Sequence, residues 1–105
     1  MKGSKVIFVY ITNPSKEEAK KIAGHLLEQR LIACANIFPT ESMYHWKGKM
    51  ADEEEFILLG KTSEENYGKI VEEVEKIHSY TTPCIIKIPI SPNDSYKNWT
   101  QNELK

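Results

Sequence analysis

The sequence has few of the features that mark whole classes of protein. It contains only two cysteines, Cys34 and Cys84, and they stand far apart. This excludes a disulfide scaffold and a structural zinc site, and it predicts a cytoplasmic location. The longest apolar runs, such as Val6–Ile11, are far too short to span a bilayer. The preceding residues, Met1–Lys5, do not read as part of a signal peptide, so no membrane association is expected.

An excess of charge is also absent. Fourteen basic residues balance fifteen acidic ones, for a net charge of -1. Such a balance offers no field for a nucleic acid or an anionic membrane, and neither partner is predicted. The sequence has no glycine-rich phosphate loop, HExxH, CxxC or nucleophile elbow, so it predicts no enzyme. With 40% hydrophobic residues, the chain has the composition of one folded domain over residues 1–105.

The first third of the chain predicts a strand followed by a helix. Lys5–Thr12 is rich in β-branched residues and apolar on both faces, which is typical of a buried strand. Asn13-Pro14 ends it, and Ser15 stands three residues before Glu18 as in a capping box. The helix that follows has an apolar face at helical spacing: Ala19, Ile22, Ala23, Leu26 and Leu27.

The middle of the chain predicts extended structure. Leu31–Ile37 indicates a second strand that Pro39 interrupts, as a bulge or edge proline does. Ser42–Trp46 resumes it, with Lys47–Lys49 as a turn and Glu55–Lys61 as a third strand. The run of acidic residues just before that strand indicates a solvated turn.

The last third predicts a helix, a strand and a tail. Thr62–Glu65 indicates a second capping box, and Cys84–Ile90 indicates a fourth strand. The tail, with Tyr96 and Trp99, is expected to be a short helix or an arm. Apolar residues at helical spacing define the helix before the fourth strand: Tyr67, Ile70, Val71, Val74 and Ile77.

This order is β-α-β-β-α-β, the split βαβ arrangement of an α/β (more narrowly α+β) ferredoxin-like sandwich. Right-handed crossovers place both helices on one face of an antiparallel sheet. The first and fourth strands are nevertheless apolar on both faces. A second copy of the chain is the simplest cover for the open face, so the protein is predicted not to be a monomer. The long hairpin of the second and third strands is expected to reach beyond the sheet and pair with a neighbour.

Several motifs resemble the CutA (CutA1) divalent-cation tolerance family. They follow one another in the family's order and span most of the chain: Thr12-Asn13-Pro14, Leu31–Ile37, Ser42–Lys49 and His78–Ile85, with Tyr96 and Trp99 closing the pattern. Three residues depart from it. Ser79 stands where the family commonly has proline, Thr81 where an acidic residue is usual, and Gly60 where a larger apolar residue is found.

The resemblance implies a homotrimer, similar in architecture to PII signalling proteins. It also implies a role in tolerance of divalent cations, copper above all. The expected partners are further copies of the chain and a divalent metal ion or small molecule. No cofactor is expected to be required, and Cu(II) or another divalent cation is the expected bound ion.

Cys34 and His78 are the candidate metal ligands. A thiolate is a soft ligand for copper, although cysteine also packs as a small buried hydrophobe. An imidazole can ligate a metal or move a proton, although a helix C-terminus alone is reason enough for a histidine.

Glu55, Lys61, Tyr80, Tyr44 and Trp46 are the candidate residues of a ligand cleft between subunits. Glu55 and Lys61 lie six apart on one predicted strand and so share a face. They could equally form a salt bridge that fixes the register of the oligomer. The aromatic residues are also explained by packing between subunits.

Three functions therefore stay open. The first is a homotrimeric metal-ion binding or response protein with sites between subunits. The second is a PII-like signalling trimer that binds a small anionic metabolite, for which Lys61 would matter more than Cys34. The third is a mainly structural oligomer, whose assembly Glu55→Ala or Lys61→Ala would weaken.

Overall fold

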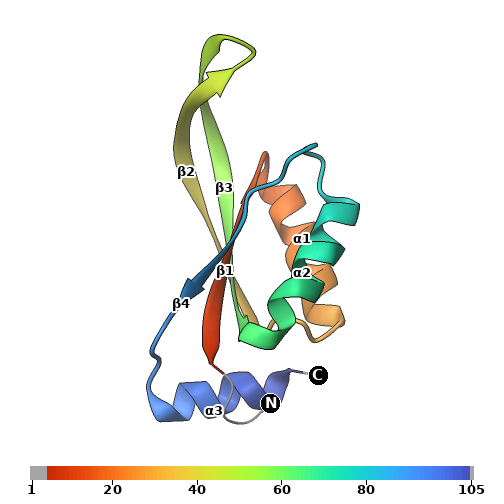
Figure 1. Ribbon diagram of the computed structural model, residues 1–105, viewed down its shortest axis with the longest axis vertical. Coiled ribbons are helices and arrows are strands. Elements are labelled where there is room, and N and C mark those ends of the chain that lie inside the picture. Colours follow the sequence, from red (N-terminus) through yellow and green to blue (C-terminus); the bar gives the residue numbers. More distant parts are fainter. Residues whose placement is uncertain (1–4, 105) are drawn as a thin grey trace.

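The computed structural model describes residues 5–104 (Figure 1). Residues 1–4, on which most of the prediction about a signal peptide depends, lie outside the described residues. The order of the elements confirms the predicted β-α-β-β-α-β arrangement and the helical tail. The elements are β1 (Val6–Asn13), α1 (Lys16–Glu28), β2 (Cys34–Trp46), β3 (Lys49–Ser63), a 3-10 turn (Glu64–Asn66), α2 (Tyr67–Ile77), β4 (Ile85–Pro89) and α3 (Asp94–Glu103).

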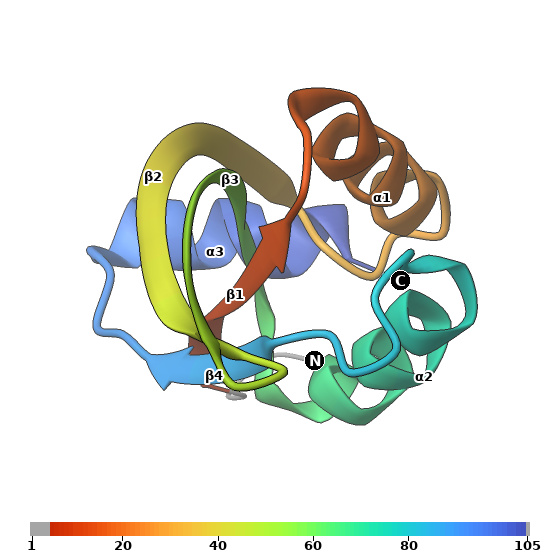
Figure 2. The same ribbon diagram turned by 90° about the horizontal axis from the view of Figure 1, so that it is seen from above.

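The four strands form one antiparallel sheet in the order β2-β3-β1-β4. Helices α1 and α2 lie side by side against one face of it, whereas α3 crosses the end of the molecule opposite to the hairpin (Figures 1 and 2). This is the predicted ferredoxin-like fold. β2 and β4 are opposite edges, and both Cys34 and Cys84 are free thiols. None of the described helices is long and apolar enough to cross a membrane.

Alternate residues of β1 build the core. Ile7, Val9 and Ile11 are at most 1% exposed and belong to the cluster that packs under α1 and α2. Gly60 pairs with Val9 and so shares this face. A Cβ atom on Gly60 would lie 3.2 Å from the Ile32 side chain. The close approach of Ile32 therefore explains a glycine at this departure from the family pattern.

Helix α1 begins as the sequence predicts. The Ser15 hydroxyl accepts a hydrogen bond from the Glu18 N–H at 3.1 Å, as in a capping box. Its predicted apolar face is wrong at one position, because Leu27 is 40% exposed. Leu27 lies at the edge of the predicted apolar stripe.

The predicted start and interruption of the second strand are wrong. β2 begins at Cys34, and Leu31 and Ile32 are buried in the core ahead of it. It then runs unbroken through Pro39, which pairs in register with Phe56 of β3. Proline is tolerated there because β2 is an edge strand and one side of it needs no ladder hydrogen bonds.

The predicted second capping box is also wrong. β3 continues to Ser63, and no side chain caps the turn or α2. The Thr62 hydroxyl instead donates to the Leu31 carbonyl at 2.6 Å, and this side chain is fully buried. The local sequence pattern assigned this hydroxyl to the start of a helix. A tertiary contact with the loop after α1 uses it instead.

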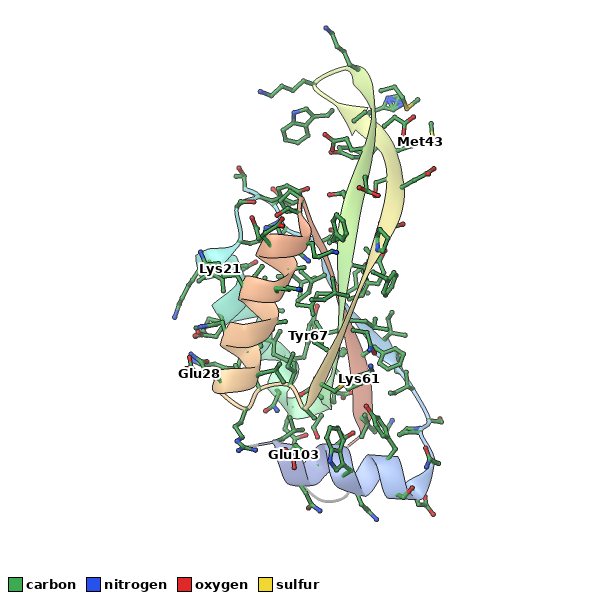
Figure 3. The ribbon with its side chains drawn as sticks, turned by 180° about the vertical axis from the view of Figure 1, so that it is seen from behind. Lys21, Glu28, Met43, Lys61, Tyr67 and Glu103 are labelled. Atoms are coloured by element: carbon green, nitrogen blue, oxygen red, sulfur yellow. The ribbon has the colours of Figure 1, made fainter. Side chains whose placement is uncertain are left out.

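The β2–β3 hairpin extends far beyond the sheet and gives the molecule its longest dimension, 46 Å. Figure 3 shows Met43 on it, at the end opposite to α3. Lys47 and Gly48 connect the strands with φ angles of 52° and 79°. Two consecutive positive φ angles are typical of a type I′ turn, which suits a long twisted hairpin. The acidic residues 52–55, predicted as a solvated turn, lie within β3.

The sheet face away from α1 and α2 stays largely open. Phe38, Ile86 and Ile88 are 41%, 46% and 37% exposed. Ile86 and Ile88 pair with Tyr10 and Phe8, so apolar side chains extend across neighbouring strands. This is the apolar face that the sequence predicts to be covered by another copy.

Candidate functional site

The candidate residues fall into two groups at opposite ends of the sheet. Glu55 and Lys61 share a face of β3, as predicted, but six residues of extended chain separate them by roughly 20 Å. Lys61 lies toward α3, whereas the hairpin extends from the other end (Figure 3). One chain therefore does not bring Glu55 and Lys61 into one cleft.

His78 is a buried residue at the end of the sheet from which the hairpin extends. Its Nε2–H donates to the Thr12 carbonyl at 2.8 Å, and its Nδ1 accepts a hydrogen bond from the Tyr80 N–H at 3.0 Å. Both ring nitrogens are therefore engaged within the chain. A metal ion could bind His78 only after one of these bonds is broken.

Glu18 holds the loop that follows α2. Its Oε2 accepts a hydrogen bond from the Ser79 N–H at 2.9 Å and lies 3.4 Å from His78 Nδ1. A proline at position 79 has no N–H to donate, so this contact depends on the departure from the family pattern. The sequence indicated only the capping role of Glu18, because its contact is sixty-one residues away along the chain.

Tyr80 connects the loop after α2 to the hairpin. Its hydroxyl donates to Glu55 Oε2 at 2.5 Å, and Glu55 is only 7% exposed. Burial first, and then the Glu55 carboxylate, raise the pKa of Tyr80 above its ordinary value. The phenol therefore stays protonated and keeps donating. This hydrogen bond offsets part of the cost of burying the Glu55 carboxylate.

Tyr44 and Glu53 repeat this pairing further along the hairpin, where the Tyr44 hydroxyl donates to Glu53 Oε1. That hydrogen bond is the main cause that raises the pKa of Tyr44 to about 12. Both pairs border a pocket of about 690 Å³ between the hairpin and the loop after α2. No lysine, arginine or histidine is among the described residues that line it. The aromatic and acidic residues that line this pocket are Tyr44, Trp46, Tyr80, Glu53, Glu54 and Glu55.

The other end of the sheet holds Cys34 beside a buried amine. Lys61 Nζ lies 3.8 Å from Cys34 Sγ and 5.8 Å from the centre of the Phe8 ring, and Lys61 is 8% exposed. Burial, followed by the charge of Cys34 and a hydrogen bond with it, raises the pKa of Tyr96. An ammonium this close opposes the approach of a metal cation to the sulfur.

The predicted site residues are thus partly assembled. One pocket is lined by Glu55, Tyr80, Tyr44 and Trp46. His78 does not line it but accepts a hydrogen bond from the Tyr80 N–H. Cys34 and Lys61 meet elsewhere, under α3. Within residues 5–104, no three His, Cys, Asp or Glu side chains converge as a metal site. Sequence reasoning missed Glu53 and Glu54 as lining residues, because it assigned the acidic run to a solvated turn rather than to β3, where it pairs with β2.

Comparisons with known proteins agree with the fold. The model of the family described as CutA1 divalent ion tolerance protein matches residues 7–103. A divalent-cation tolerance protein CutA from Archaeoglobus fulgidus is 52% identical over 83 residues, which cover 79% of this chain and 81% of that protein. A chloroplastic protein CutA 1 from Oryza sativa is 39% identical over 101 residues, covering 94% of this chain and 57% of that protein.

Among solved structures, the periplasmic divalent cation tolerance protein CutA from Archaeoglobus fulgidus superposes with a TM-score of 0.92. It is 44% identical, and the match covers 95% of this chain and 99% of that one. The names of these relatives, one periplasmic and one chloroplastic, contradict the predicted cytoplasmic location. That prediction was wrong because it used the scarcity of cysteine. A fold that closes its core without disulfides needs none in any compartment.

Proposed function

We propose that this chain, which belongs to the CutA1 divalent ion tolerance protein family, binds divalent cations as an oligomer of identical subunits. The resemblance of its motifs makes a homotrimer the expected assembly. The proposed role is binding rather than catalysis, and the names of the relatives give no enzymatic activity. The proposed cation site is the pocket between the hairpin and the loop after α2.

One observation carries this proposal: the pocket is acidic and has no basic residue among its described lining residues. Glu53 and Glu55, which share a face of β3 with the Tyr44 side of β2, supply carboxylates, and the two tyrosine hydroxyls add neutral oxygen donors. Carboxylate oxygens suit hard divalent ions such as Mg²⁺ or Mn²⁺, which keep part of their water shell. A hydrated ion fits a pocket of about 690 Å³ without three convergent ligands.

The same observation disfavours the alternatives. A small anionic metabolite would meet the carboxylates of Glu53 and Glu55, while Lys61 lies at the far end of the sheet. Cys34 and His78 stay candidate copper ligands, each in its own surroundings: Cys34 beside Lys61, and His78 with both ring nitrogens engaged. Copper bound by either one would define a site separate from the pocket.

Calorimetric titration of the reduced protein with Mn²⁺ and, separately, with Cu²⁺ tests the proposal. Mn²⁺ prefers oxygen ligands, so Glu55→Gln is expected to weaken its binding about tenfold, the effect of losing one charged ligand. Glu28→Gln is the matched control, because it removes the same charge from an exposed position on α1. Cys34→Ser and His78→Asn test whether copper uses thiol or imidazole.

Mn²⁺ affinity that is equal in the native protein, Glu55→Gln and Glu28→Gln would overturn the pocket as the cation site. Loss of Cu²⁺ binding in Cys34→Ser alone would move the site to the end of the sheet under α3. Sedimentation of each variant shows whether a loss of binding follows from loss of the assembly.

A further inference from the structure

The pocket between the hairpin and the loop after α2 is larger and more aromatic than the site of a metal ion requires. Its volume of about 690 Å³ lies in the range typical of sites for small organic molecules. Three aromatic rings, from Tyr44, Trp46 and Tyr80, line it together with the carboxylates. A metal ion held through oxygen makes no use of ring faces. An organic cation does, because the negative face of an aromatic ring attracts positive charge.

The two tyrosines are arranged to strengthen that attraction. Each donates its hydroxyl hydrogen to a carboxylate, Tyr44 to Glu53 and Tyr80 to Glu55. A phenol that donates to an anion gains electron density on its oxygen and in its ring, so its face becomes more negative. Each carboxylate has a second oxygen with which to balance a bound positive charge.

The chain itself supplies an example of the contact. At the tip of the hairpin, Lys47 Nζ lies 5.8 Å from the centre of the Trp46 ring, a cation–π distance. In the single chain Trp46 is 62% exposed, so an ammonium group can reach the same ring. The Lys47 ammonium group therefore shows how the ammonium group of a ligand would contact the Trp46 ring, and it would compete with that ligand for the ring.

We propose that this pocket binds a small organic ammonium ion, with its head group against the rings of Tyr44, Trp46 and Tyr80 and its charge balanced by Glu53 and Glu55. The inference rests on the proposed function for the location of the site and the sign of the bound charge. It goes beyond that function in the ligand class, because an alkylammonium ion offers no coordination chemistry and binds through ring faces and charge alone.

Choline and 3,3-dimethyl-1-butanol provide the test, because they have nearly the same shape and only choline is charged. The protein carries two tryptophans, so Trp99→Phe leaves the Trp46 indole N–H as a single signal in a ¹H–¹⁵N correlation spectrum. Choline is expected to shift this signal saturably, with an affinity at least tenfold above that of the alcohol. Equal affinity for the two would overturn the proposal, because the pocket would then bind only apolar surface.

Two further variants examine the charges. Glu55→Gln is expected to weaken choline binding about tenfold, the effect of one lost charged contact. Lys47→Gln removes the competing ammonium from an exposed turn and is expected to strengthen binding about twofold to fivefold. Glu28→Gln again serves as the control for net charge. Choline affinity that stays constant across all three variants would overturn the proposal.

The metal titrations separate this inference from the proposed function. Mn²⁺ binding that depends on Glu55, without any shift of the Trp46 signal by choline, leaves the proposed function intact and overturns the inference. Choline binding that depends on Glu55, without Mn²⁺ binding, supports the inference and overturns the metal site in the pocket.

Discussion

Arg30 adopts a left-handed backbone conformation directly after α1, with a φ angle of 58°. The Leu31 N–H donates to the Leu26 carbonyl at 2.9 Å, and the Arg30 N–H donates to the Leu27 carbonyl at 3.0 Å. This pair of bonds is the Schellman motif, in which the left-handed position is usually glycine. Any residue with a Cβ atom is strained there by about 1 kcal/mol or more.

We therefore expect Arg30→Gly to be more stable than Arg30→Ala by about 1 kcal/mol. Both variants lose the exposed contact with Glu103, where the closest charged atoms are 3.5 Å apart, so that contact cancels in the comparison. The free energy of unfolding in guanidinium chloride gives the measurement. Equal stability of the two variants would show that the turn relaxes and stores no strain.

Gly60 and Ser79 show what single residues reveal only once they are placed in the fold. Gly60 departs from the family pattern because Ile32 approaches it across the core, and Ser79 departs from it at a position where its N–H binds Glu18. Each reason is a contact with a residue distant in sequence. A local pattern registers such residues only as departures and does not supply their cause.

At the scale of elements, Glu73 fastens α2 to α1. Its carboxylate lies 2.8 Å from His25 Nε2, 3.3 Å from Gln29 Nε2 and 3.4 Å from Lys76 Nζ. The hydrogen bond with His25 is the largest cause that lowers the pKa of Glu73, from 4.5 to about 2, followed by Lys76 and Lys69 and opposed by burial. The folded protein thus holds this carboxylate ionised more firmly than the unfolded chain does.

A carboxyl whose pKa is lower in the folded state stabilises the fold fully above pH 4.5 and loses that effect as the pH falls toward 2. We expect the melting temperature of Glu73→Gln to lie below that of the native protein above pH 4.5. The gap should close between pH 4.5 and 2. Glu75→Gln, a change of the same charge at an exposed position of α2, should show no such trend. A gap that is constant with pH would contradict the role of the charge.

The order of the elements could be predicted from the sequence because it depends on local periodicity. The apolar, β-branched run of β1 and the apolar stripes of α1 and α2 are each visible within a dozen residues. Thr62 and Pro39 were misjudged because their surroundings are set by Leu31 and by the edge position of β2. The site divides in the same way: Tyr44 and Trp46 are neighbours on one strand, whereas the contact of Tyr80 with Glu55 depends on how the loop after α2 folds back.

At the scale of the whole molecule, the open sheet face connects the fold with the assembly. Phe38 on β2 and Ile86 and Ile88 on β4 lie on this face toward opposite edges of the sheet, with Phe8 and Tyr10 of β1 beside the two isoleucines. Phe38, Ile86 and Ile88 are each more than a third exposed. Contiguous apolar surface of this kind is uncommon on a monomer and is typical of an interface. The long hairpin, which reaches well beyond the four-stranded sheet, adds an edge with which a neighbouring copy can pair.

Ile88→Glu tests whether this face holds the assembly together. It places a carboxylate on the open face beside Phe8, and burying an unpaired charge in an interface costs several kcal/mol. That cost corresponds to a loss of more than about a hundredfold in association. The native protein is expected to sediment as a trimer of 12.1 kDa chains, and Ile88→Glu to shift toward the single chain. Asn102→Glu, which adds the same charge on an exposed turn of α3, should leave the assembly unchanged. A native protein that sediments as one chain, or an Ile88→Glu variant that stays assembled, would mean that the open face is not the interface.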